Sequence, residues 1–139
     1  MKFIKILTSP ILVVILFSLI LVSGEHFGGF YIMYLLMAIP HGGLHAIFAM
    51  VGIGLVLFSY RRYRGQAQFI IEPILNIIGI FLLYASLLFF FYRSWEYNDQ
   101  TFEQGVPVTS LILFGVVSIA FLIQSVTSFA QSESVKDNS

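Results

Sequence analysis

The stretch AIPHGGLHAIF, residues 38–48, interrupts the longest apolar segment of the chain and decides how that segment folds. The segment covers residues 30–59, and as one straight helix it would be about 45 Å long, against a hydrocarbon core of about 30 Å. Tilt alone does not absorb this excess. Pro40 lacks a backbone donor and disfavours helical geometry in the residue before it, and the two glycines that follow weaken the helix further. The sequence therefore predicts a break near Pro40, with a spanning helix over residues 40–59 and a short interfacial or re-entrant helix before it on the outer side.

The whole chain has the composition of an integral membrane protein. Of its 139 residues, 58% are hydrophobic and 10% are charged, and the mean hydropathy is +0.92, whereas soluble domains carry about a quarter charged residues. Four apolar segments each approach or exceed the roughly 20 residues that cross a bilayer, and they are too long and too little alternating for barrel strands. We therefore expect an all-α integral membrane protein. Its fold would be a four-transmembrane-helix bundle with helices at about residues 4–22, 40–59, 69–91 and 107–129, followed by a polar tail at 130–139.

The first apolar segment also has features of a signal peptide. Lys2 and Lys5 precede its apolar core, and the small residues of LVSG, residues 21–24, follow it. The apolar run is longer than the core of most signal peptides. We therefore expect this segment to be an uncleaved helix.

The distribution of basic residues predicts the orientation, because Lys and Arg accumulate in cytoplasmic loops. All basic residues except Arg93 fall on one side of the predicted bundle: Lys2, Lys5, Arg61, Arg62, Arg64 and Lys136. We expect both termini and the tail to be cytoplasmic, or to face the matrix if the membrane is mitochondrial. The bacterial cytoplasmic (inner) membrane is the expected location.

Several function classes lack support in the sequence. The chain has no cysteine, which excludes disulfides and thiolate metal sites. Its seven basic and seven acidic residues balance, so charge does not indicate a nucleic-acid partner. No phosphate-binding loop or nucleophile motif is present, and no long soluble loop could house a catalytic domain. We identify no catalytic residues and expect no catalytic activity of the chain's own.

The histidines are the candidate ligand-binding residues. His41 and His45 are four residues apart, so in a continuous helix they would share one face and could bind one metal ion. His26 is a possible third ligand on the same side of the membrane, and such a set would suit a divalent ion such as Zn²⁺. Haem is an alternative, although two residues of one helix cannot ligate opposite faces of a haem. The histidines could instead bond backbone carbonyls that the proline break frees, or serve a proton-linked or quinone site.

Small residues recur at multiples of four in the second segment, at Ala38, Gly42, Ala46 and Gly54. Such spacing lets helices approach closely, so this face is expected to pack on another helix.

The function predicted first is that of a small accessory or assembly subunit, embedded in the lipid bilayer and packing against a larger membrane protein. The alternative is a metal- or haem-linked redox or transport subunit that uses His41 and His45 near the outer face. A third possibility is a small channel or transporter, formed by oligomerisation, with Asn76 and the histidines on its path.

Overall fold

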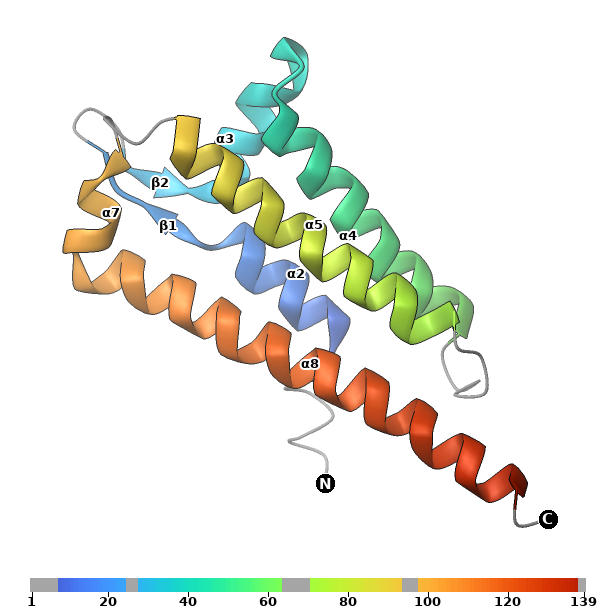
Figure 1. The fold of residues 1–139 in the computed structure, drawn as a ribbon. Helices are drawn as coiled ribbons and strands as arrows, with labels where there is room; N and C mark the ends of the chain where they lie inside the picture. Colours follow the sequence, from blue (N-terminus) through green and yellow to red (C-terminus); the bar gives the residue numbers. More distant parts are fainter. Residues whose placement is uncertain (1–7, 25–27, 64–70, 94–97, 138–139) are drawn as a thin grey trace.

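The computed structural model describes residues 8–24, 28–63, 71–93 and 98–137. This part of the chain is mostly helical, as the composition predicts, and it contains one short hairpin (Figure 1). In chain order the elements are α2 (Pro10–Ser18), β1 (Leu21–Val22), β2 (Gly29–Phe30), α3 (Tyr31–Ala38), the 3-10 turn η1 (Ile39–His41), α4 (Leu44–Tyr63), α5 (Ile71–Arg93), α7 (Gln100–Glu103) and α8 (Gly105–Asp137).

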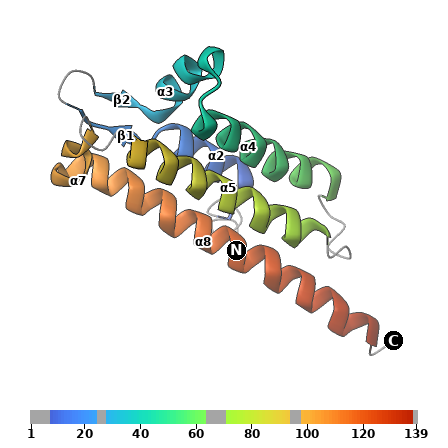
Figure 2. The same cartoon turned by 45° about the horizontal axis from the view of Figure 1, so that its top comes forward.

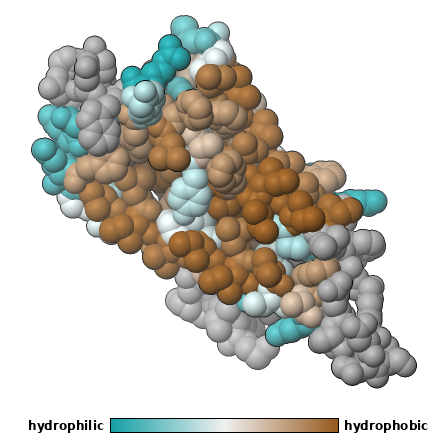
Figure 3. Space-filling model, in the orientation of Figure 1, coloured by the Kyte–Doolittle hydropathy of each residue, from teal (hydrophilic) through white to brown (hydrophobic). Residues whose placement is uncertain are grey.

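Three helices, α4, α5 and α8, are long and apolar enough to cross a membrane. Helices α4 and α5 lie side by side and antiparallel, and α8 packs against α5 and α2 (Figures 1 and 2). Helix α8 continues through the predicted polar tail as far as Asp137 and extends past the ends of α4 and α5. The face shown in Figure 3 is mainly apolar over the helices, and hydrophilic residues lie toward its two ends, including the end where α7 lies. These features identify a multi-pass membrane protein by helix length and composition, while the orientation of the termini stays a prediction.

The first apolar segment differs from the predicted helix over residues 4–22. In the described part of this segment the helix begins at Pro10 and ends at Ser18, and its 9 residues span only about 14 Å. Ser9, just before the proline, has an extended backbone (φ −77°, ψ 129°), which is the conformation that a following proline favours. Residues 4–7 lie outside the described part of the chain. The expected fourth span is therefore not confirmed.

The residues that follow α2 form an antiparallel hairpin instead of a helix. Leu21 pairs with Phe30 and Val22 with Gly29. Non-helical backbone at membrane depth is tolerated only where protein groups satisfy its polar atoms. Two hydroxyls supply these partners, because Leu21 N donates to Ser110 Oγ over 3.0 Å, and Thr101 Oγ1 both accepts from the N–H and donates to the carbonyl oxygen of Ser23 over 2.9 Å.

The core lies where α2 and α3 pack between the longer helices. Phe17 of α2 is fully buried, and its ring centroid lies 5.3 Å from that of Tyr31 in α3 and 5.5 Å from that of Phe114 in α8. The Tyr31 ring in turn meets Phe90 of α5 edge-to-face at 5.1 Å. These aromatic contacts join four helices around one centre and hold the short helices α2 and α3 against α5 and α8.

Candidate functional site

The chain breaks between α3 and α4 through a glycine turn. Gly42 adopts a left-handed conformation with φ of 63°, Gly43 N donates to Ala38 O over 3.1 Å, and Gly42 N donates to Ile39 O over 3.2 Å. This pair of hydrogen bonds is a Schellman motif, in which glycine is favoured because it carries no Cβ. The predicted interruption is therefore present. The following helix starts at Leu44 instead of Pro40, because Pro40 lies in the 3-10 turn that ends α3.

His41 lies on the surface at the end of this turn. Its ring Nδ1 is 3.0 Å from the carbonyl oxygen of Met37, one helical turn earlier. A carbonyl oxygen only accepts hydrogen bonds, so Nδ1 carries the proton of this contact, and a neutral imidazole would then have its lone pair on Nε2. This contact is the kind expected from the proline break, in which a histidine satisfies a backbone carbonyl at a helix end.

His45 occupies a different environment, in the first turn of α4. Its half-buried ring lies 5.4 Å from the ring centroid of Phe90 in α5. Its Nε2 atom is buried and has no hydrogen-bond partner among the described residues. Its backbone carbonyl accepts a hydrogen bond of 2.7 Å from Ser86 Oγ. His45 is thus turned toward α5, while His41 is exposed.

The helical spacing that would have placed the two histidines on one face is interrupted by Gly42. His26, the predicted third ligand, lies outside the described residues. Within residues 8–24, 28–63, 71–93 and 98–137, no group of three or more His, Cys, Asp or Glu side chains is placed to hold a metal ion. Whether His41 or His45 binds a ligand is left as a prediction.

A buried polar network, which the sequence reasoning did not identify, connects α3, α4 and α5. Tyr31 Oη and Ser86 Oγ are 2.8 Å apart, and Ser86 Oγ donates to the backbone carbonyl of His45. Burial raises the pKa of the Tyr31 phenol, so it stays protonated and able to donate. The only signal in the sequence was the presence of two hydroxyl side chains in apolar surroundings. The network orders the backbone at the start of α4.

The small residues predicted to pack on a partner helix have separate places in the structure. Ala46 is buried, Ala38 is half-buried and Gly42 forms the turn. A Cβ added to Gly54 would meet no atom within 4 Å, so this glycine faces outward. Helices α4 and α5 approach each other closely at Gly52, a glycine that is not among the small residues spaced by multiples of four. A Cβ on Gly52 would lie 2.8 Å from the carbonyl oxygen of Gly79.

Polar residues of the last two spanning helices also form specific contacts. Asn76 Nδ2 donates to Ser125 Oγ over 2.9 Å and joins α5 to α8, as expected for an amide between membrane helices. Tyr84 Oη and Ser118 Oγ form a second such link at 2.7 Å. These hydrogen bonds hold the two helices together. Asn76 is buried between them.

No family model, no curated protein and no solved structure matches this chain.

Proposed function

We propose that this chain is a small accessory or assembly subunit that packs against a larger integral-membrane complex, in the cytoplasmic membrane of a bacterium with both termini cytoplasmic. The proposal is supported by the small share of the spanning helices that is buried within the chain. Spanning helices α4 and α8 bury only 28% of their most apolar stretches within the chain, and the elements outside the spans are short. Most of the surface of α4 and α8 is therefore available to lipid or to another membrane protein.

The observation that carries the proposal is a polar pair on the outward face of α8. Gln124 and Thr127 are exposed within the span Gly105–Gln131. Gln124 Nε2 donates to Ser128 Oγ over 3.0 Å, and Thr127 Oγ1 donates to Ile123 O over 2.8 Å, so both bonds stay within α8. In lipid such groups find no water, whereas a partner helix can bond them, at about 0.6–2 kcal/mol each.

The test is recovery of partners from the native membrane. The full chain with an N-terminal affinity tag is extracted in mild detergent, and the proteins that co-purify are quantified by mass spectrometry. We expect at least one larger membrane protein in near-stoichiometric amount. The double variant Gln124→Leu/Thr127→Val should lose it, because it removes both polar groups and keeps the apolar surface.

A matched control is available on the same helix. Thr109 is also exposed, and its Oγ1 donates to Gly105 O over 2.7 Å in the same manner. Thr109→Val should retain the partner. Recovery of the wild-type chain only as a free monomer would refute the accessory-subunit proposal, and equal loss in both variants would refute the role of Gln124 and Thr127.

A second candidate function is a metal- or haem-linked redox or transport subunit that uses His41 and His45. The hydrogen bond from His41 Nδ1 to Met37 O favours it, because metal-binding histidines commonly donate their second ring N–H to a backbone carbonyl. The purified chain should then contain stoichiometric metal or show a haem absorption band, and His41→Ala or His45→Ala should remove that signal. Protein without metal and with a featureless visible spectrum would eliminate this candidate.

A further inference from the structure

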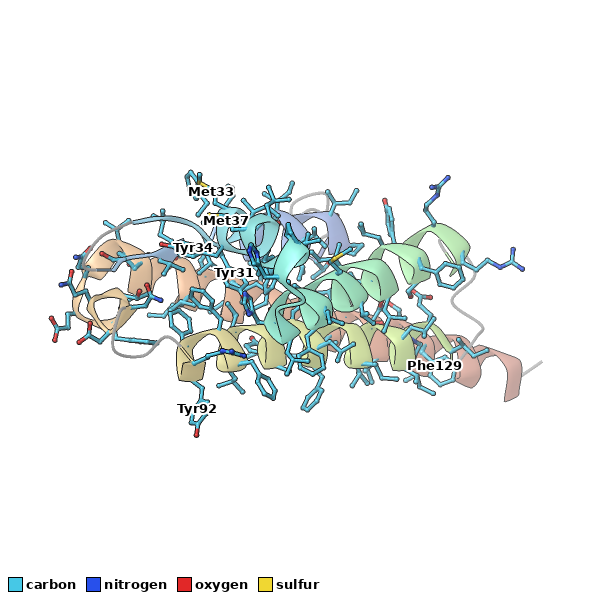
Figure 4. The ribbon with its side chains drawn as sticks, turned by 90° about the horizontal axis from the view of Figure 1, so that it is seen from above. Tyr31, Met33, Tyr34, Met37, Tyr92 and Phe129 are labelled. Carbon is cyan, nitrogen blue, oxygen red and sulfur yellow. The ribbon has the colours of Figure 1, made fainter. Side chains whose placement is uncertain are left out.

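Two thioethers and one imidazole follow each other along the short element before the break. Met33 and Met37 are one turn apart in α3, and His41 comes one turn later, in η1. Residues four apart on a helix share a face, with Cβ atoms about 5–6 Å apart. Figure 4 shows Met33 and Met37 next to each other on the outer edge of α3. The two sulfur-containing side chains therefore lie where long, flexible side chains can converge on one ion.

The two methionines are accessible, unlike most large apolar side chains of the core. Met33 is 54% exposed and Met37 is 62% exposed. They line a hollow of about 220 Å³ together with Gly28, Gly29 and Tyr34. Gly29 faces the sulfur of Met33, because a Cβ at this glycine would lie 3.6 Å from Met33 Sδ. The hollow leaves space beside the thioethers for an incoming ion or for a small molecule that carries it.

The hydrogen bond of His41 prepares its other nitrogen for a metal. Since Met37 O accepts a hydrogen bond from Nδ1, the neutral form of the exposed ring presents its lone pair on Nε2. The same hydrogen bond folds the imidazole back toward the turn that carries Met37. His45 is not a member of this group, because its ring packs against Phe90 of α5.

We propose that Met33, Met37 and His41 form a binding site for Cu(I). Thioether sulfur is a soft ligand that selects Cu(I), and imidazole also binds copper. Zn²⁺ is less suited to this set, because its protein ligands are thiolates, imidazoles and carboxylates. The ion enters and leaves as Cu(I), so binding requires no electron transfer. The inference deepens the second candidate function and is independent of the partner contact on α8.

The test measures competition for Cu(I). The purified full chain in detergent is titrated, without oxygen and with ascorbate, into the coloured complex of Cu(I) with bicinchoninate. We expect one Cu(I) per chain to be withdrawn. Met33→Leu, Met37→Leu and His41→Gln should each weaken the affinity tenfold or more. Met50→Leu is the matched control, because Met50 is an equally exposed methionine (57%) on α4, and it should leave the affinity unchanged.

Leucine replaces methionine with little change of volume, so the variants should fold, and circular dichroism and size-exclusion chromatography check this. The site is refuted if the wild-type chain withdraws no Cu(I), or if the double variant Met33→Leu/Met37→Leu binds as tightly as wild type. Metal that is lost in His41→Ala or His45→Ala but kept in the methionine double variant would support a histidine site and overturn this one. Partner co-purification in the same variants shows separately whether the accessory-subunit proposal holds.

Discussion

Replacement of Gly52 by alanine tests the packing that holds α4 against α5. The new Cβ would lie 2.8 Å from the carbonyl oxygen of Gly79 and 2.8 Å from Leu83 Cδ2, which is 0.6 Å short of the 3.4 Å where ordinary contact begins. Leu83 can change its rotamer, but the Gly79 oxygen is backbone and moves only if the helices separate. Overpacking of this kind costs about 1–3 kcal/mol.

Gly54→Ala is the matched control, because it makes the same chemical change on the same helix with no atom within 4 Å of the added Cβ. Alanine is favoured over glycine in a helix by about 1 kcal/mol in water, and both variants gain this preference. The difference between them therefore isolates the clash, and we expect Gly52→Ala to be less stable by about 1–3 kcal/mol.

Stability is measured by thermal unfolding in detergent, followed by circular dichroism, and by SDS titration in mixed micelles. We expect the midpoint of Gly52→Ala to lie several degrees below that of Gly54→Ala, and Gly79→Ala to behave like Gly52→Ala because its Cβ would lie 2.6 Å from Val56 Cγ2. Equal midpoints for Gly52→Ala and Gly54→Ala would show that α4 and α5 do not approach each other at this glycine.

Two other substitutions test the polar contacts that fix the short elements. Thr101→Val removes both hydrogen bonds to the backbone of Ser23 and should destabilise the protein by on the order of 2 kcal/mol, with faster exchange of the Ser23 amide, whereas Thr109→Val should have little effect on stability. Equal stability of the two would refute the role given to Thr101. Ser86→Ala removes the contact with Tyr31 Oη and the bond to the His45 carbonyl, while Tyr31 Oη keeps the Ser86 carbonyl oxygen at 3.2 Å, so it should cost about 0.5–1.5 kcal/mol for each lost bond in the same unfolding assay. The double variant Tyr31→Phe/Ser86→Ala should lose less stability than the sum of the two single variants, and an additive loss would argue against a coupled network.

The helix break shows how far local sequence predicts this fold. Pro40 and the glycines after it predicted an interruption, and the structure contains one, because both residue types act through their own backbone. The predicted start of the spanning helix was wrong by several residues, since the Schellman turn at Gly42 places the proline at the end of one helix and not at the start of the next. The hydrogen bonds of a turn depend on which carbonyl each N–H reaches, and spacing alone does not give this.

The first segment shows where hydropathy fails. Residues 19–22 are as apolar as a membrane helix, but Leu21 and Val22 form a strand. Hydropathy reports that a residue avoids water and does not distinguish a lipid-facing helix from a hairpin that packs against other parts of the protein. Pro10 was a local signal for the helix start that the length-based prediction did not use, and the partners of the hairpin backbone, Thr101 and Ser110, lie far along the chain.

The sequence by itself determined that the chain belongs in a membrane, which segments are apolar and where the second of them breaks, because these properties follow from composition and from residues close in sequence. Only the tertiary structure decided that the first segment turns back as a hairpin, that α4 meets α5 at Gly52, and that His41 and His45 face different surroundings. Each of these depends on contacts between residues distant in sequence, whose energies no single segment contains.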